Sequence, residues 1–384
     1  MRVLQTIAGF GARSGGTSTC TYDLLKALQG LNCNTELLTP NVKTPTDSIM
    51  GNGEEWIKVV ENDNISPYGY SRNIRQALQA SDYDIYHTNG LWMHCNHITC
   101  SIARKKGKPY IITPHGMLYP AALKRSYWKK WPLIKLFFNK DIMHATCMHA
   151  TCKQEMENIR AFGYKGPIAV IGNPASIPSY IDDLKGRDKN NELTVFGFLG
   201  RLHPVKKVEN ILYGMAECSQ EKRTRMRLII MGKGDELYEQ FLRKEVERLT
   251  LTEHVEFKGF INGRGKFEQL SQLHTLFVPS DFENFGMIVT EALACKTPVF
   301  ASLGTPWEEL NKRQCGWWMD RTPNNIAKVM TQVIDMTAEE IDAMGERGRT
   351  LVEEKFTAES VAKQMQELYT WIAENREKPR FVHI

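Results

Sequence analysis

The feature that most constrains the fold of this chain is an alternation of short apolar segments with longer helix-like segments. In the first half, segments with the length and composition of β-strands lie at residues 2–8, 35–38, 84–87, 110–113, 143–146 and 168–171. Helix-length segments separate most of them. Because strands that are joined through helices form parallel sheets covered on both faces, the pattern predicts an α/β fold.

The same alternation restarts in the second half, with strand-like segments at 193–199, 227–231, 255–258, 276–279 and 298–301. The residues between the halves are rich in Pro, Asn, Asp and Gly, as is typical of a linker. We predict a doubly wound domain over 1–172, a linker over 173–192, a second doubly wound domain over 193–356, and a C-terminal helix and tail over 357–384. Two such domains that face each other form a ligand cleft.

The composition is that of a globular protein and excludes several other classes. Of 384 residues, 42% are hydrophobic and 24% are charged, and no run of about 18 uncharged apolar residues could cross a membrane. The first residues lack the apolar run of a signal peptide. The nine cysteines form no C-x-x-C pair, and their odd number favours reduced thiols. We expect a cytoplasmic protein.

Two short segments contain residue types that bind metal ions. His94, Cys95, His97 and Cys100 could ligate zinc, but no second ligand pair stands out, and the segment has the pattern of an ordinary helix start. The segment Asp82-Tyr83-Asp84 has the spacing of a sugar-transferase metal site, but it precedes a strand, away from the expected cleft. We expect no metal and no cofactor.

Positive charge is concentrated in one segment. The whole chain carries a net charge of +5, yet residues 104–140 contain ten Lys or Arg and no Asp or Glu. The densest part, at 124–140, also contains several aromatic residues. A basic, aromatic, partly amphipathic segment suits an anionic membrane surface. We favour peripheral membrane contact over two alternatives, a solvated helix with a core stripe and a nucleic-acid site.

The most informative segment is SDFENFGMIVTEALACKTPVF at residues 280–300. Glu283 lies in a loop after a strand, and Glu291 lies inside the helix that begins near Gly286, about 7.5 Å along its axis. The amides expected to point out of the helix N-terminus belong to Asn284, Phe285, Gly286 and Met287. Such a helix end binds phosphate, and the two carboxylates can reach hydroxyls on either side of it.

A second segment, GRLHPVKK at residues 200–207, follows a strand and opens a helix. Arg201 and Lys206 are suited to a pyrophosphate, and Lys207 could share that role. Because the helix dipole disfavours cations at a helix N-terminus, their presence there suggests an anionic ligand.

Three further loops follow strands. Gly15 and Gly16 would let the first loop approach a ligand closely. The loop MGKGDEL at 231–237 lacks the dinucleotide-binding spacing and is best explained as a tight turn. His115 follows a strand at the edge where open α/β sheets place their sites, and it could donate a hydrogen bond to a hydroxyl or phosphate.

Together, the motifs GRLHPVK, MGKGD, VPSDFENFGMIVTEALACKTPV and TPWEELNKRQCGWW resemble the family-four retaining glycosyltransferases of the GT-B architecture. The resemblance extends from SGG in the first loop to the last helix and is closest to enzymes of exopolysaccharide, capsule and lipopolysaccharide assembly. It implies two Rossmann-like domains, with the acceptor side in the first, the nucleotide-sugar site in the second, and a C-terminal helix that returns to the first. The position of Lys207 is often Gly in this family.

The resemblance also implies roles for single residues. Arg201 and Lys206 would hold the donor diphosphate, and Glu283 would bind hydroxyls of the donor sugar. Glu291 would bind the ribose, and His115 would lie beside the anomeric centre. The remaining donor contacts would come from Gly16, Asn284, Phe285, Gly286 and Met287.

The reaction that this implies is metal-independent transfer of a hexose from a nucleotide sugar, such as a UDP- or GDP-sugar, to a glycan or lipid-linked acceptor with retention of configuration. We expect residues 124–140 to hold the enzyme at the inner face of the cytoplasmic membrane, and we expect no nucleic-acid partner. Two alternatives stay open, a sugar-nucleotide epimerase of the same architecture and a non-catalytic sugar-nucleotide-binding subunit of an assembly complex.

Overall fold

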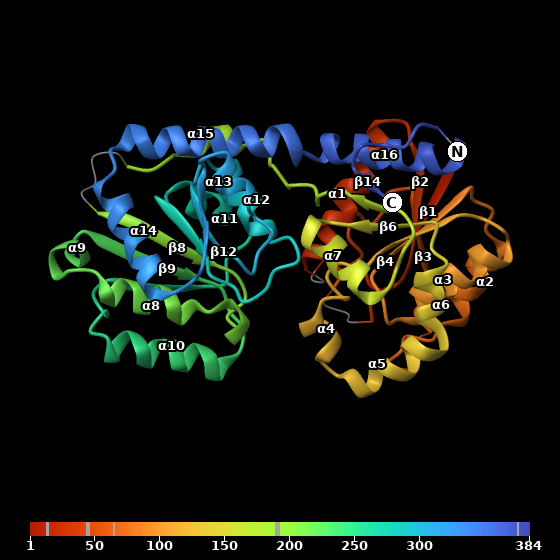
Figure 1. Cartoon of the computed structure of the whole chain (residues 1–384), viewed down its shortest axis with the longest axis horizontal. Coiled ribbons are helices and arrows are strands. Elements are labelled where there is room, and N and C mark those ends of the chain that lie inside the picture. Colours follow the sequence, from red (N-terminus) through yellow and green to blue (C-terminus); the bar gives the residue numbers. More distant parts are fainter. Residues whose placement is uncertain (13–14, 44–46, 64–65, 189–192, 375) are drawn as a thin grey trace. The chain divides into compact units, whose positions relative to one another are not determined.

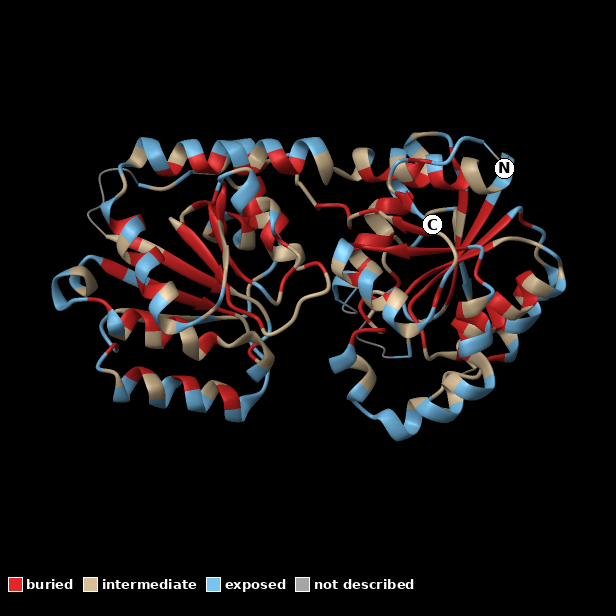
Figure 2. Ribbon diagram, in the orientation of Figure 1, coloured by how far each residue is buried: buried red, intermediate tan, exposed pale blue. Residues whose placement is uncertain are grey.

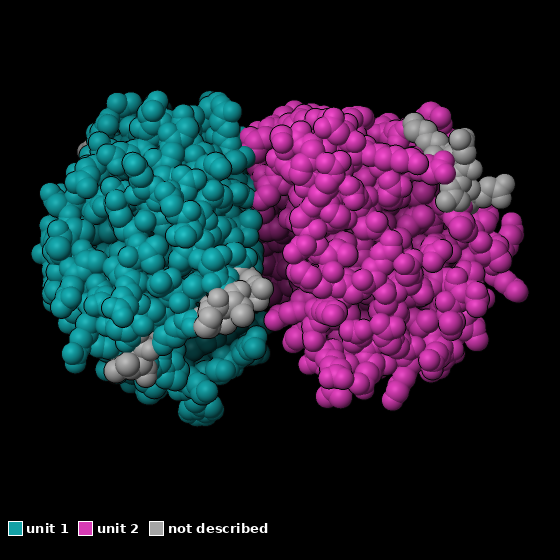
Figure 3. All heavy atoms as spheres, turned by 180° about the vertical axis from the view of Figure 1, so that it is seen from behind, with its two compact units in different colours: residues 1–174, 358–384 teal, residues 175–357 magenta. Residues whose placement is uncertain are grey.

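The chain forms two compact units in the computed structural model, which describes residues 1–12, 15–43, 47–63, 66–188, 193–374 and 376–384 (Figures 1 and 3). Unit 1 contains residues 1–174 and 358–384, and unit 2 contains residues 175–357. Each unit is an α/β structure with one sheet. The α/β prediction with two Rossmann-like halves is confirmed.

Unit 1 has an eight-stranded sheet in the order β14-β7-β6-β5-β4-β1-β2-β3, parallel except for β14. Its strands are β1 Arg2–Ile7, β2 Asn34–Pro40, β3 Ile57–Val60, β4 Ile85–Asn89, β5 Tyr110–Thr113, β6 Cys147–Ala150, β7 Ile168–Val170 and β14 Val382–His383. Its helices are α1 Gly16–Gly30, α2 Arg72–Ala80, α3 His94–Lys105, α4 Pro120–Lys124, α5 Tyr127–Leu133, α6 Asn139–Met143, α7 Lys153–Phe162 and α16 Ala358–Glu374, with a π-helical turn at Ile134–Phe138.

Unit 2 has a six-stranded parallel sheet in the order β10-β9-β8-β11-β12-β13. Its strands are β8 Thr194–Leu199, β9 Met226–Met231, β10 Val255–Gly259, β11 Thr275–Val278, β12 Val299–Ser302 and β13 Gly316–Met319. Its helices are α8 Val208–Glu217, α9 Gln220–Thr224, α10 Glu236–Arg248, α11 Gly263–Ser271, α12 Met287–Ala294, α13 Glu309–Lys312, α14 Pro323–Asp335 and α15 Ala338–Lys355. Short 3₁₀ turns lie at Ile181–Asp183 and Pro204–Lys206.

The central strands β4, β5, β11 and β12 are buried along their whole length, because helices cover both faces of each sheet (Figure 2). In β1, Val3 packs into one cluster and the next residue, Leu4, packs into the cluster on the opposite face. In unit 2, Ile229 and Ile230 divide in the same way between two clusters. Successive side chains on a strand point to opposite faces, so near-continuous apolar runs are what a doubly covered sheet needs.

The last long helix, α16, belongs to unit 1 although it follows all of unit 2 in the sequence. Its buried residues Met365, Leu368 and Tyr369 share a cluster with Leu25 and Leu28 of α1. The tail then adds β14 to the edge strand β7.

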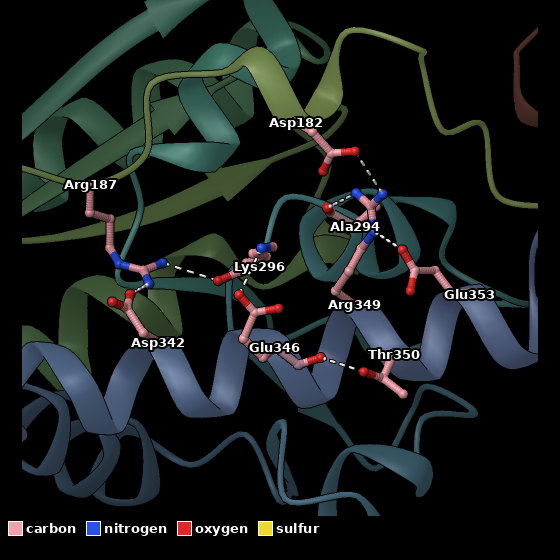
Figure 4. A network of polar contacts seen from close by, with 9 residues as sticks. All are labelled: Asp182, Arg187, Ala294, Lys296, Asp342, Glu346, Arg349, Thr350 and Glu353. Carbon is pink, nitrogen blue, oxygen red and sulfur yellow. Dashed lines mark hydrogen bonds and ion pairs between the residues drawn. The ribbon is translucent and has the colours of Figure 1, made fainter.

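The segment predicted as a linker is for the most part a packed portion of unit 2. Ala175 and Ile181 are buried in a unit 2 cluster. Arg187 donates to Asp342 at 2.6 Å (Figure 4). Residues 189–192 lie outside the described part of the chain.

A second polar contact ties the same segment to α15. The Arg349 side chain reaches Asp182 at 3.5 Å and donates to the Ala294 carbonyl at 2.8 Å (Figure 4). These apolar and polar contacts explain why residues 175–188 pack as part of unit 2.

Several local predictions were wrong. The strand expected at 143–146 forms instead at Cys147–Ala150, since α6 continues to Met143. Strands β3, β13 and β14 were not predicted.

Neither segment weighed for metal binding forms a ligand cluster among the described residues. His97 Nδ1 contacts Asp141 at 2.7 Å, and Asp84 accepts from the backbone amide of Arg2 at 2.7 Å. No helix in the described ranges has the length and apolar character needed to span a bilayer.

Candidate functional site

The candidate donor-site residues of unit 2 lie at the carboxyl edge of its sheet. Strands β8 and β11 are parallel neighbours, so the loops that follow them leave from the same edge. The first loop carries Arg201 and Lys206, and the second carries Glu283 and Gly286. In open α/β sheets, ligands bind at this edge.

Lys206 and Glu283 form an ion pair between these two loops. Their side chains are only 20% and 15% exposed. Ser280 Oγ donates to the same carboxylate oxygen, Glu283 Oε1, at 2.9 Å. The Glu283 amide donates to the Gly304 carbonyl at 3.0 Å, which ties the loop to the end of β12. In the part of the chain that the structure describes, no side chain donates to Oε2 of this carboxylate, so that oxygen can accept from a hydroxyl of a ligand.

Arg201 precedes Lys206 in the same loop and is exposed. Among the residues that the structure describes, no carboxylate forms an ion pair with it. Lys207, in contrast, is engaged with Glu209 at 3.6 Å and Asp281 at 3.7 Å. The two lysines therefore differ in their partners: Lys206 pairs with the predicted site carboxylate Glu283, whereas Lys207 pairs with two carboxylates that were not predicted to bind a ligand.

The start of α12 is held in place by apolar packing. Phe285 is buried against the rings of Trp307 and Phe356, with centroid distances of 5.3 and 5.5 Å. Trp307 Nε1 donates to the Phe285 carbonyl. Gly286 is the N-cap residue and has a φ of 77°, a conformation that favours glycine. Asn284 and Met287 flank this turn and are half-buried.

Glu291 lies in the second turn of α12 and pairs with Lys266 of α11 at 2.7 Å. The two side chains are 12% and 21% exposed, so the pair is largely shielded. Lys266 was missed by sequence reasoning, because the contact joins helices that are separated in the sequence.

The loop MGKGD has a structural role, as predicted. A Cβ atom on Gly232 would lie 1.9 Å from the Gly200 carbonyl oxygen, and one on Gly234 would lie 2.1 Å from the Leu202 carbonyl oxygen. The Leu202 amide also donates to the Lys233 carbonyl at 3.2 Å. The glycines therefore let the two loops pack backbone against backbone, and this fixes the loop that carries Arg201.

In unit 1, His115 follows β5 after one intervening residue, Pro114, at the carboxyl edge of its sheet. It has a φ of 51° and is followed by Gly116 with a φ of 79°. Glu155 is fully buried and holds this turn, since it accepts from the Gly116 amide and from the Thr151 amide and hydroxyl. A non-glycine residue in this conformation persists only where its surroundings determine it.

A chain of hydrogen bonds crosses the sheet of unit 1, and one end fixes its direction. The Ile171 carbonyl can only accept, so His149 Nε2 donates to it at 2.8 Å and His149 Nδ1 is an acceptor. The Thr113 hydroxyl then donates to His149 Nδ1 at 2.8 Å and accepts from His87 Nε2 at 2.7 Å.

The chain continues from His87 to His115. Tyr369 of α16 donates to His87 Nδ1 at 2.8 Å and accepts from Gln5 Nε2 at 2.8 Å. Gln5 Oε1 accepts from Asn89 Nδ2 at 2.8 Å, which turns Asn89 Oδ1 toward His115 Nε2 at 3.2 Å. Because an amide oxygen only accepts, His115 carries its proton on Nε2.

Burial keeps the histidines of this chain neutral. It lowers the pKa of His115 to about 3, with a further contribution from His149, and it lowers the pKa of His149 to about 4. The pKa of His87 is also well below its usual value because of burial. His115 therefore offers Nδ1 as an acceptor, whereas sequence reasoning expected a donor.

Gly16 is the first residue of α1 and is exposed. The preceding Gly15 has a φ of 88° and caps the helix. Residues 13 and 14 of the same loop lie outside the described ranges, so the close approach expected for Gly16 stays a prediction.

Two family profiles match almost the whole length of the chain. Residues 15–174 match the profile described as a glycosyl transferase 4-like domain, and residues 181–351 match the one described as glycosyl transferases group 1. The first lies within unit 1 and the second within unit 2. The chain belongs to the GT-B glycosyltransferases.

Curated glycosyltransferases resemble parts of the chain. A glycosyltransferase of Methanocaldococcus jannaschii, itself uncharacterised, is 28% identical over 175 residues, which are 45% of this chain and 43% of that protein. The mouse alpha-1,3/1,6-mannosyltransferase ALG2 is 27% identical over 208 residues, 51% of this chain and 49% of that protein. The chain thus spans at most about half the length of these relatives.

Solved glycosyltransferase structures share the fold over the full length. Anabaena HepE, in complex with UDP and glucose, has a TM-score of 0.73 at 18% identity and covers 96% of this chain and 99% of that chain. The lipopolysaccharide outer core galactosyltransferase WaaB has a TM-score of 0.69 at 19% identity and covers 98% of this chain and 100% of that chain. At this identity the likeness concerns the fold.

The sequence predicted most of the polar residues at the carboxyl edges of the two sheets but not the residues that support them. Ser280 and Lys266 hold the two site carboxylates, while Asn89 and Glu155 hold His115. Some of these contacts join different elements, and others join polar residues at a short spacing that is common in sequences. No sequence motif therefore predicts them.

Proposed function

We propose that this chain transfers a hexose from a nucleotide sugar to an acceptor hydroxyl, without a metal ion and with retention of the anomeric configuration. The donor is bound by unit 2 at the edge that carries Arg201, Lys206 and Glu283, and His115 of unit 1 acts in the same reaction.

The observation that carries this proposal is the Lys206–Glu283 pair beside the start of α12. Two cations, a carboxylate with one unengaged oxygen and a helix N-terminus come together at the edge formed by β8 and β11. A diphosphate needs the cations and the helix end, while a sugar needs the carboxylate. A nucleotide sugar combines both groups in one ligand.

The contacts within the free site leave both a donor and an acceptor available for the ligand. A lysine ammonium has three hydrogens, so Lys206 can keep Glu283 and still donate to a phosphate oxygen. Glu283 Oε1 is taken by Lys206 and Ser280, which leaves Oε2 for a hydroxyl of the donor sugar. Glu291, paired with Lys266, lies further along the helix and suits the ribose hydroxyls.

Catalysis in this proposal is electrostatic. As the glycosidic bond breaks, negative charge develops on the leaving diphosphate, where Arg201, Lys206 and the first amides of α12 stabilise it. These groups replace a metal ion in that role. No covalent nucleophile is assigned. The acceptor oxygen attacks the anomeric carbon from the face of the leaving group as the bond from that carbon to the diphosphate oxygen breaks, and the leaving diphosphate takes the acceptor proton, which accounts for retention.

His115 acts as a neutral acceptor. Its Nε2 proton is held by Asn89, and its pKa of about 3 keeps it uncharged at physiological pH. Nδ1 then accepts a hydrogen bond from a hydroxyl near the anomeric centre. An imidazolium there would oppose the positive charge of an oxocarbenium-like transition state.

The acceptor class and the location belong to the same proposal. Relatives that resemble part of the chain include the phosphatidyl-myo-inositol mannosyltransferase of Mycobacterium leprae, 34% identical over 110 residues and covering 27% of each chain. Together with WaaB, it supports a glycan or lipid-linked glycan acceptor in cell-surface polysaccharide synthesis. The location that we propose for this reaction is the inner face of the cytoplasmic membrane.

A donor panel tests the proposal. Thermal unfolding is measured with UDP-, GDP-, ADP- and CMP-sugars, with and without EDTA, for the natural chain and for Arg201→Ala and Glu291→Gln. We expect one nucleotide class to raise the midpoint, EDTA to leave that shift unchanged, and both variants to lose it.

Arg225→Ala is the matched control. Arg225 is exposed and directly precedes β9, so it lies at the opposite edge of the sheet from Arg201. The control variant keeps the shift. Failure of every donor to bind contradicts the proposal, and conversion of the donor to a new sugar nucleotide without an acceptor favours an epimerase instead.

A further inference from the structure

We infer that one face of unit 1 docks onto the surface of an anionic lipid bilayer. The face is built by α4, α5 and the π-helical turn Ile134–Phe138, and we call it the basic face. Docking would bring the proposed transferase to a membrane-bound acceptor, so the purpose of docking rests on the proposed function. The evidence for a lipid partner comes from the side chains of the face itself.

Large apolar side chains are concentrated on the basic face. Trp128 is 85% exposed and Leu136 is 69% exposed, while Tyr127 and Trp131 are each 45% exposed. Of the eleven exposed large hydrophobic side chains in the described residues, four therefore lie between positions 127 and 136. Figure 2 shows α5 as exposed along most of its length. Contiguous exposed apolar side chains mark interaction sites.

The opposite side of the same segment is anchored in the core of unit 1. Phe138 is 1% exposed, and Leu123, Leu133 and Phe137 pack against the same cluster. The Lys130 ammonium donates to the Ala122 carbonyl, which joins α5 to α4. The outer apolar side chains therefore stand on a fixed support and do not belong to a poorly packed loop.

Exposed cations surround these apolar side chains. Lys124, Arg125, Lys129 and Lys135 are all exposed. Lys135 Nζ lies 4.8 Å from the centre of the Trp131 ring. Because residues 104–140 carry a charge of +10 and the whole chain +5, the rest of the chain carries −5. The charge is thus a local property of this part of the molecule.

The chemistry of the face favours a bilayer over other occupants. Tryptophan and tyrosine beside lysine suit the headgroup level of a membrane, where an apolar body and a polar tip are both accommodated. An exposed aliphatic side chain such as Leu136 enters the apolar part of a bilayer interface, whereas it has no stacking role in a nucleic-acid site. A second copy of the chain would bring like charges together.

Vesicle sedimentation tests the inference. The full-length chain is mixed with phosphatidylcholine vesicles that contain or lack phosphatidylglycerol. We expect binding only with the anionic lipid, and weaker binding as salt rises. Neutralising Lys124, Arg125, Lys129 and Lys135 to Gln lowers partitioning at least about a hundredfold, since each cation near the surface contributes about fivefold.

A second variant tests the apolar contribution. Trp128→Ser lowers partitioning about tenfold, because the indole no longer enters the interface. Quenching by brominated lipid reports the depth directly: in the natural chain a fraction of the tryptophan emission is quenched, and Trp128→Phe reduces that fraction to the part that comes from Trp131 while it keeps most of the binding.

The matched control removes the same charge elsewhere on unit 1. Exposed cations outside the basic face are replaced by Gln at Lys26, Lys153, Lys165 and Arg380. This variant keeps its vesicle binding to within a few fold. Equal losses in the two quadruple variants would overturn the inference, because they would show that only the net charge matters.

Donor binding separates this inference from the proposed function. All vesicle-binding variants keep the thermal shift given by the nucleotide sugar, since none of the changed residues belongs to the donor site. Vesicle binding without any donor binding contradicts the proposed function and leaves the docking face standing. Donor binding without vesicle binding, or binding to single-stranded RNA in place of vesicles, overturns the docking face.

Discussion

Lys206 and Lys207 are neighbours in the sequence, but the structure gives them different partners. Lys206 reaches Glu283 across the candidate site, whereas Lys207 has a φ of 52° and turns to Glu209 and Asp281. The local turn decides which of the two ammonium groups lies against Glu283. Two neighbouring residues of the same type can thus have different roles.

We predict that Lys206→Met lowers kcat for sugar transfer about a hundredfold or more, because it removes the positive charge that stabilises the leaving diphosphate. Lys207→Met changes kcat only a few fold. Steady-state kinetics of the two variants with the donor found in the panel checks this. Equal losses in both variants would contradict the assignment of the diphosphate to Lys206.

Asn89 positions His115 by fixing which nitrogen carries the proton. We predict that Asn89→Asp raises the pKa of His115 from about 3, because a carboxylate favours the imidazolium. The natural enzyme then shows no loss of rate from this group above about pH 4, whereas the variant loses rate as the pH falls through the new pKa. Identical pH profiles would contradict the positioning role.

At the scale of single elements, the glycines of the MGKGD loop are needed because two backbone segments lie too close for a Cβ atom, although a search for ligand-binding motifs would also find them. We predict that Gly234→Ala destabilises unit 2 by about 2 kcal/mol or more, because its Cβ would lie 2.1 Å from the Leu202 carbonyl oxygen. Gly265→Ala in α11, where the Cβ meets nothing within 4 Å, is the control and raises stability by about 0.5 kcal/mol. Denaturant unfolding monitored in unit 2 measures both.

The buried histidines of the unit 1 sheet give a pH dependence to its stability. His87 and His149 are neutral in the folded chain, with a pKa of about 4 for His149, whereas an unfolded histidine titrates near about 6.5. Between these values the unfolded chain binds more protons, so the free energy of unfolding falls as the pH falls. We predict a loss of about 1 kcal/mol per histidine for each pH unit below about 6.

Chemical denaturation of the natural chain between pH 7 and 5 measures this loss, and His149→Gln should reduce the slope. A slope that His149→Gln leaves unchanged would mean that other groups carry the acid sensitivity.

At the scale of the whole molecule, the sequence was sufficient to predict two α/β halves, because a covered parallel sheet needs apolar runs at regular spacing. It was also sufficient for the carboxyl-edge residues Arg201, Lys206, Glu283 and His115. Strands β3, β13 and β14 were missed, since short edge strands lack a strong apolar pattern. The packed course of residues 175–188 was missed because proline and glycine also occur in folded segments.

The supporting contacts could not be predicted for a different reason. Lys266 meets Glu291, Glu155 meets Gly116, and Tyr369 meets Gln5 only after the chain has folded. Each residue by itself has many possible partners at its sequence distance. The charge and aromatic content of residues 124–140 were visible in advance, but the side chains that stay exposed were not.

Hydrogen exchange with and without the nucleotide sugar is the decisive test of donor binding at the edge formed by β8 and β11, since it locates the ligand on the chain. We predict slower exchange in peptides that cover residues 199–208 and 280–295 of unit 2, and no change in peptides of α15. Protection confined to other segments of unit 2, or the same protection pattern in Arg201→Ala as in the natural chain, would contradict it.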